Sequence, residues 1–262
     1  MMAGRMLTAL IAAVTVFVAQ DGLAQSMSAQ NVVVAAAEAL GMVRGPARRM
    51  DSINTVEFTG NGSLSIAGTD DEWATSSLRA TFGISYYIPA ARFDLEQVRD
   101  DGESRRRILV VRDDEAWNER LPGVDPTPAM NSVAERLRQI HLTPHGVIRA
   151  AVENPDAVTI SSEAARTVIT VEIDGQAYRA VLDDNYRPER VETTIDHPRL
   201  GRTVHSATYS NYIDWPKLDV YFPSRIVHNI GDETTLDLTV TEFYQNPYVV
   251  FPTPELLNRS SQ

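Results

Sequence analysis

The clearest structural signal in the chain is the segment Val168–Leu182, VITVEIDGQAYRAVL. Apolar and polar residues alternate on both sides of Asp174-Gly175, and this period of two is typical of half-buried β-strands. Asp-Gly is a turn dipeptide whose geometry fits the twist of two antiparallel strands. We therefore predict a hairpin with one apolar face, on which residues pair across the turn: Ile169 with Ala180, Val171 with Tyr178, and Ile173 with Gln176.

The same alternation recurs along most of the chain, for example in Ile53–Gly68 around a Gly-Asn-Gly centre. Helical patterns are confined to two places. Asn31 can cap a first helix that Gly41 ends. In the middle of the chain Ala129–Leu142 predicts a helix, and Thr143 can cap another that starts at Pro144. These patterns predict an α+β fold: a long curved antiparallel sheet, an open or half barrel, with a few helices packed on its concave side.

The first residues have the features of a secretory signal peptide. Arg5 precedes the apolar run Met6–Ala19, and small residues at Gly22 and Ala24 suit a signal peptidase. The run is shorter than the roughly 20 residues needed to span a bilayer. We therefore predict a signal peptide at residues 1–24, a single β-rich domain at residues 25–262, and a periplasmic or secreted protein that does not span the membrane after processing.

Composition excludes several functions. The 262 residues contain no cysteine, so there is no lipidation cysteine, no disulfide and no thiolate chemistry. The net charge of −11 argues against nucleic acid, whose phosphates require a basic surface. No nucleotide-binding glycine motif and no G-x-S-x-G turn is present, so we expect no cofactor and assign no catalytic residue.

The pair His141 and His145 in HLTPHG invites a metal-binding interpretation, because His-x-x-x-His on one helix can hold zinc. Pro144 biases Thr143 toward extended backbone, so we expect a helix boundary between the two imidazoles. A catalytic zinc also needs three protein ligands, and the remaining histidines are scattered through predicted strands. We predict no metal, although an enzyme using His145 or a histidine-bound metal stays open as an alternative.

Aromatic residues are common on the predicted strands, and most of them belong in a core. A curved sheet too wide for its own side chains to fill would nevertheless leave an apolar cavity. We expect five residues to line such a ligand site: Trp117, His145, Tyr209, Tyr212 and Phe222.

A series of short motifs resembles the N-terminal, non-catalytic region of exported metallo-β-lactamase-fold hydrolases, over roughly Val32 to Pro247. The motifs occur in the order Ala36–Gly41, Gly60–Ser63, Ala116–Asn118, Thr143–Ala151, Tyr209–Tyr212, Phe222–Ile226 and Asp237–Thr241, followed by Asn246. The resemblance implies that HLTPHG is a strand-to-helix junction. The His-x-His-x-Asp-His metal cluster of those hydrolases is absent from this sequence, so their activity is not implied.

The expected architecture is also similar to that of periplasmic lipoprotein carriers, which is a likeness of fold alone. We therefore expect an exported, non-catalytic binding protein that holds a hydrophobic ligand, a lipid or an acyl chain, between its sheet and its helices. The alternative is an accessory interaction module that docks on a separate metallo-β-lactamase-fold hydrolase as its protein partner.

Overall fold

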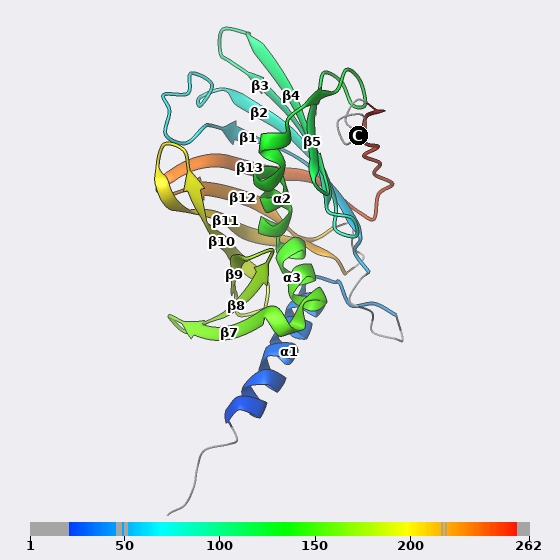
Figure 1. Ribbon diagram of the computed structural model, residues 1–262, viewed down its shortest axis with the longest axis vertical. Coiled ribbons are helices and arrows are strands. Elements are labelled where there is room, and N and C mark those ends of the chain that lie inside the picture. Colours follow the sequence, from blue (N-terminus) through cyan, green and yellow to red (C-terminus); the bar gives the residue numbers. More distant parts are fainter. Residues whose placement is uncertain (1–20, 46–48, 50–51, 216, 218, 256–262) are drawn as a thin grey trace, which may run out of the picture.

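The computed structural model describes residues 21–45, 49, 52–215, 217 and 219–255, so most of the predicted signal peptide lies outside the described residues. The described chain forms one sheet of thirteen strands with three α-helices (Figure 1). The helices are α1 (Asp21–Ala39), α2 (Val133–Leu142) and α3 (Pro144–Glu153). The strands are β1 (Thr55–Leu64), β2 (Ser77–Ser85), β3 (Ala90–Val98), β4 (Ser104–Arg112), β5 (Glu115–Glu119), β6 (Thr127–Pro128), β7 (Val158–Glu163), β8 (Arg166–Ile173), β9 (Gln176–Leu182), β10 (Pro188–His197), β11 (Gly201–Asp214), β12 (Tyr221–Ile230) and β13 (Glu233–Gln245).

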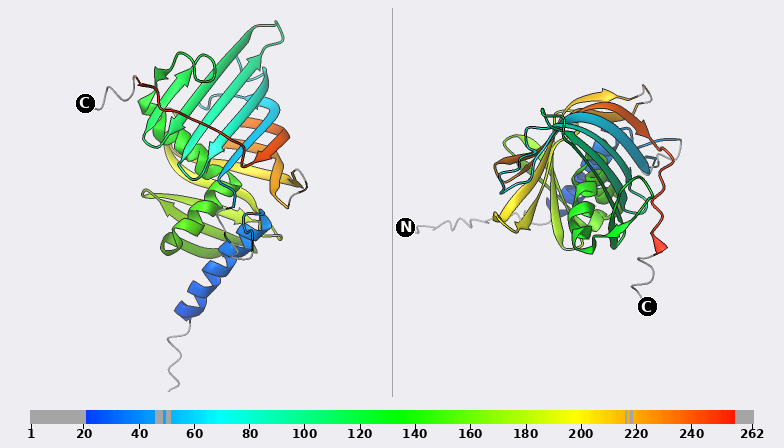
Figure 2. Two further views of the ribbon diagram at one scale, coloured as in Figure 1. Left: turned by 90° about the vertical axis from the view of Figure 1, so that its right-hand side faces the viewer. Right: turned by 90° about the horizontal axis from the view of Figure 1, so that it is seen from above.

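The sheet consists of two antiparallel meanders joined at its centre. Strands β1 to β6 run outward to one edge, and β7 to β13 run inward from the other edge. The two meanders meet where β1 pairs with β13, with Phe58 opposite Phe243. Helices α2 and α3 connect the two edges and lie inside the curve of the sheet (Figure 2). The predicted long curved antiparallel sheet with helices on its concave side is therefore confirmed.

The hairpin predicted from Val168–Leu182 forms as β8 and β9. Ile169 pairs with Ala180, Val171 with Tyr178, and Ile173 with Gln176, as the alternation indicated. Asp174 and Gly175 have φ of 50° and 76°, the two positive values that this type of tight turn requires.

The first helix differs from its prediction at one end. It begins at Asp21, so Asn31 lies inside the helix and is not its N-cap. An N-cap pattern marks where a helix can start, but preceding residues that also favour helix can extend it backwards. The predicted end is confirmed, because the helix stops at Ala39 and Gly41 follows with φ of 76°.

The two faces of the sheet bury separate groups of side chains. On the concave face, Phe58 stacks on Phe82 with ring centroids 4.8 Å apart, and Phe222 stacks on Phe243 at 4.5 Å. These rings belong to the main core, which the helices cover. On the convex face of β3–β5 a smaller cluster forms under the C-terminal segment, which crosses these strands (Figure 2). It contains Ala90, Ile108, Val110, Trp117 and Phe251.

Candidate functional site

The HLTPHG segment is a helix-to-helix junction. Helix α2 ends at Leu142, Thr143 has extended backbone, and α3 begins at Pro144. The Thr143 side chain accepts a hydrogen bond from the Gly146 amide at 3.0 Å, so the predicted N-cap and the predicted boundary between the histidines are confirmed. The strand-to-helix junction implied by the resemblance is wrong, because the residues before Thr143 continue the α2 helix.

His145 is a fully buried core residue. Its Nε2 lies 3.3 Å from the Leu40 carbonyl oxygen, and its ring stacks on Phe222 with centroids 5.8 Å apart. Burial lowers the pKa of His145 to about 4, against a small opposing effect of the Leu40 carbonyl. The Nδ1 atom has no hydrogen-bond partner, and no carboxylate contacts the ring among the described residues. This environment keeps the imidazole neutral and offers no acid–base pair.

Three of the other expected site residues lie in the same core as His145. The Tyr209 hydroxyl donates to the Leu142 carbonyl, and the Tyr212 hydroxyl donates to the Pro188 carbonyl at 2.6 Å. Burial raises the pKa of both tyrosines well above the ordinary value. Tyr209, Phe222 and His145 thus pack around the end of α2 and the start of α3, with Tyr212 packed against this core from the side.

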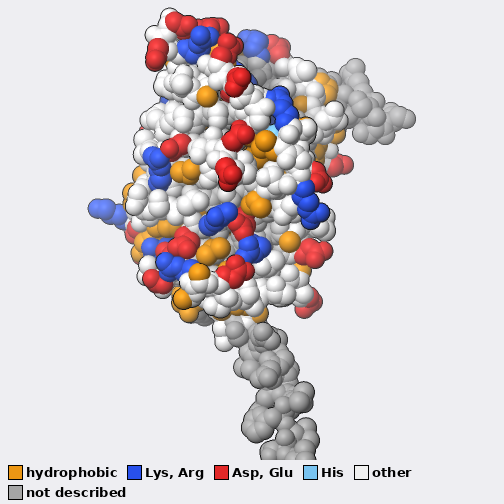
Figure 3. Space-filling model, turned by 90° about the vertical axis from the view of Figure 1, so that its left-hand side faces the viewer, with side chains coloured by type: hydrophobic (Ala, Val, Ile, Leu, Met, Phe, Trp, Pro, Cys, Tyr) orange, Lys and Arg blue, Asp and Glu red, His pale blue; other side chains and the backbone are white. Residues whose placement is uncertain are grey.

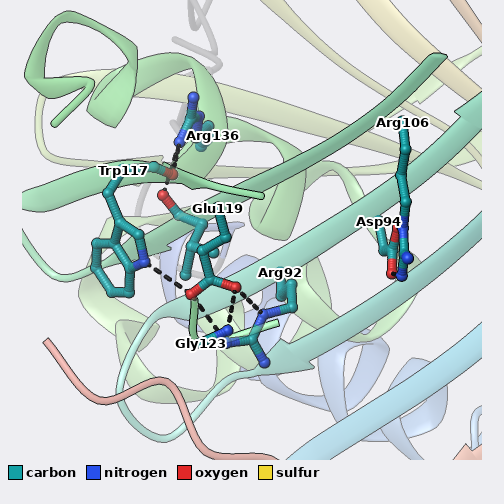
Figure 4. Close-up of polar contacts among 8 residues, drawn as sticks. Arg92, Asp94, Arg106, Trp117, Glu119, Gly123 and Arg136 are labelled. Atoms are coloured by element: carbon teal, nitrogen blue, oxygen red, sulfur yellow. Dashed lines mark hydrogen bonds and ion pairs between the residues drawn. The ribbon is translucent and has the colours of Figure 1, made fainter. Parts of the chain in front are cut away.

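Trp117 lies apart from this group, on the convex face of β5 (Figure 4). Its indole Nε1 donates to Glu119 at 2.9 Å, and Glu119 also accepts from Arg92 and the Gly123 amide. Burial alone would raise the pKa of Glu119, but these hydrogen bonds hold it below its usual value. The expectation that Trp117 shares a site with the other four residues followed from its residue type, and the alternation of β5 directs it to the opposite face.

A narrow apolar gap separates α2 from the floor of the sheet. It has a volume of about 20 Å³, and its lining includes Phe58, Phe82, Phe93, Tyr209, Phe222 and His228. Ligand sites for molecules of lipid size span about 300–1,000 Å³, whereas this volume holds about one water molecule. The gap is therefore too small to hold an acyl chain in this structure.

A polar cluster that was not predicted from the sequence lies beside this gap. His205 and His228 point into the concave side from β11 and β12, with ring centroids 5.6 Å apart. Arg138 on α2 acts electrostatically on His205 and lowers its pKa, and the ring of His141 on the same helix lies 5.4 Å from that of Tyr178 on β9. The alternation of the strands could have predicted this position. His205 lies on the same strand face as Ala207 and Tyr209, and His228 lies on the same strand face as Ile226.

An open hollow of about 410 Å³ lies between β9 and β10. The two strands pair from Leu182–Pro188 to Arg179–Glu192 and then separate. Its lining is mostly polar and charged, including Gln176, Arg179, Glu192, Thr193, Asp196 and Arg202. The Gln176 amide donates to the Thr193 hydroxyl at 2.6 Å and bridges the separated strands.

No protein-family model and no curated protein matches the chain. Within the described residues, no helix is both long and apolar enough to cross a membrane. The described His, Asp and Glu side chains also do not gather into a group of three that could hold a metal ion.

Proposed function

We propose that the protein is an exported, non-catalytic binding protein that holds a hydrophobic ligand, a lipid or an acyl chain, between α2 and the concave face of its sheet. The aromatic gap under α2 carries the proposal. It is the place where an apolar floor meets a covering element that is only half-buried: Val133, Leu137 and Gln139 of α2 keep part of their surface in contact with solvent.

The attachment of α2 to the sheet determines what widening the gap costs. Arg136 is its main polar anchor, donating to the Val110 carbonyl at 2.8 Å, to the Trp117 carbonyl at 2.6 Å and to the Asn118 side chain at 2.6 Å. Moving α2 breaks these hydrogen bonds and exposes Ile140, Leu142 and the aromatic floor, so a bound apolar chain has to replace the burial that is lost.

The first experiment is purification of residues 25–262 from the periplasm, followed by native mass spectrometry and organic extraction. A stoichiometric lipid or other apolar molecule is the expected result. Absence of bound material, together with no binding of added fatty acids or alcohols, would contradict the proposal.

A pair of variants localises the site. Gln139 lines the gap, whereas Ala134 is exposed on the same helix. Gln139→Phe should weaken binding of a fluorescent fatty-acid probe about fivefold or more, because an overpacked site loses roughly 1–3 kcal/mol. Ala134→Phe should bind the probe as the unmodified protein does. Equal affinities of the two variants would place the ligand elsewhere.

The alternative, an accessory module that docks on a separate metallo-β-lactamase-fold hydrolase, is favoured by one observation. The C-terminal segment buries Val249 and Phe251 against β3–β5 but leaves Tyr248 95% exposed and Val250 46% exposed. On the face shown in Figure 3, apolar side chains are instead scattered among basic and acidic ones. Cross-linking in the native cell tests this function. The expected result is a hydrolase linked to the protein through Tyr248 or its neighbours.

A further inference from the structure

Arg138 on α2 is a half-buried cation without a counter-ion. Its Nε atom is buried and has no hydrogen-bond partner. The other described arginines that are not exposed each have a hydrogen bond or an ion pair, for example Arg92 with Glu119 and Arg149 with Glu153. Burying a charge without a partner is unfavourable. Such a cation therefore suits an anionic ligand group as its partner.

The two histidines beside Arg138 supply neutral hydrogen-bonding groups. His205 is 2% exposed and its Nδ1 has no hydrogen-bond partner, and His228 is 9% exposed. Burial, the neighbouring His228 and Arg138 lower the pKa of His205 to about 2, and burial lowers that of His228 to about 4. Each imidazole is therefore uncharged at neutral pH and keeps one N–H to donate.

No acidic side chain neutralises this cluster among the described residues. Glu135 on α2 acts on Arg138 from an exposed position, and Asp174 in the β8–β9 turn acts on His141 and Tyr178. Neither carboxylate forms an ion pair or a hydrogen bond with Arg138. The cluster thus has one net positive charge and N–H groups from two strands.

One residue of the cluster lines the apolar gap, and another is paired with a residue of the polar hollow. His228 lines the aromatic gap under α2. His205 is paired across the sheet with Thr193, which lines the hollow between β9 and β10. A ligand with an apolar chain and a single charged end would place the chain in the gap and the charged end at the cluster that contains Arg138.

We infer that Arg138, together with His205 and His228, binds the carboxylate of a long-chain fatty acid whose chain occupies the gap under α2. This inference rests on the proposed function and specifies its ligand. One negative charge matches the one unpaired guanidinium, which can bind both oxygens of a carboxylate through parallel N–H groups. A single chain suits a gap that opens by movement of one helix.

The test compares laurate with 1-dodecanol, which has the same chain length but no charge, by calorimetry on residues 25–262. Laurate should bind about tenfold to a hundredfold more tightly, the range expected for a charge-assisted hydrogen-bonded pair. Arg138→Met should bring the affinity for laurate down to that for 1-dodecanol while leaving the latter unchanged. Arg190→Met, which removes an exposed arginine of β10, should keep the preference for laurate.

Arg138→Lys provides a second variant in case the methionine variant does not fold. It keeps the charge but cannot bind both oxygens in the same plane, so part of the preference should be lost. Equal binding of laurate and 1-dodecanol by the unmodified protein, or an unchanged preference in Arg138→Met, overturns the inference and leaves the apolar site intact. Failure of both molecules to bind overturns the apolar site and the inference together.

Discussion

Helices α2 and α3 are adjacent, equally long and differently buried. Every residue of α3 from Pro144 to Ala151 is buried, whereas α2 buries only Arg136, Ile140 and Leu142. The difference follows from composition, because α3 is apolar on nearly all sides and α2 carries charged residues around most of its circumference. Helix α3 is therefore a structural plug on the concave side of the sheet, and α2 is a half-buried cover.

The largest expected effect comes from cutting equivalent apolar side chains in the two helices. Ile148 of α3 is fully buried and Leu137 of α2 is half-buried. Ile148→Ala should lower the free energy of unfolding by about 2–5 kcal/mol, since it leaves a cavity in the core. Leu137→Ala should cost clearly less because part of that side chain already contacts water. Denaturant titration measures both, and equal losses would remove the distinction between plug and cover.

The pH dependence of stability should include a contribution from α3, beside those of His205 and His228 on the sheet, whose pKa values burial also lowers. The folded-state pKa of His145 is lowered by burial to about 4 from an ordinary value of 6.5. The unfolded chain therefore takes up the proton first, and stability present above about pH 6.5 is lost as the pH falls toward 4. Replacing the imidazole should remove about 2 kcal/mol of the loss between pH 7.5 and pH 5.

The measurement is the difference in unfolding free energy between these two pH values for His145→Phe and the unmodified protein. His141→Phe on α2 is the matched control. Burial also lowers the pKa of His141, but this imidazole is only half-buried, so its replacement should change the pH dependence less. A larger effect at His141 than at His145 would reverse the comparison.

The smallest expected effect concerns the junction between the helices. The Thr143 hydroxyl caps α3 through the Gly146 amide, donates to the Ile140 carbonyl at 2.7 Å and lies 3.0 Å from the Tyr86 hydroxyl. Thr143→Ala should destabilise the protein by about 1–2 kcal/mol, as loss of an N-cap does. Thr143→Ser retains the hydroxyl and should recover most of this loss. If the alanine variant melts as the unmodified protein does, the cap does not hold the two helices at their present angle.

Local features of the fold were predictable from neighbouring residues. The β8–β9 register follows from alternation and one Asp-Gly turn, and the α2–α3 boundary follows from Thr143-Pro144. Both depend on interactions within a few residues of the chain, which is the range over which a turn or a cap acts. The predicted start of α1 was less accurate, because a capping residue inside a longer helical stretch does not prevent the helix from extending on its N-terminal side.

The candidate site was only partly predictable. His145, Tyr209, Tyr212 and Phe222 do lie in or beside one core. Aromatic residue type alone could not show that Trp117 faces the other side, because that depends on the register of β5 and on the C-terminal segment that covers it. It also could not show that the core side chains nearly fill the space under α2.

By itself, the sequence determined the strands, the tight turn, the two central helices and the antiparallel class, since the period of apolar residues and the turn dipeptides act locally. The tertiary structure alone decided that β1 closes on β13 and that α3 fills the centre of the curve. It also placed Arg138 near His205, which lies far along the chain. These outcomes depend on long-range packing, because the residues that lie near Arg138 belong to strands that are distant from it in the sequence.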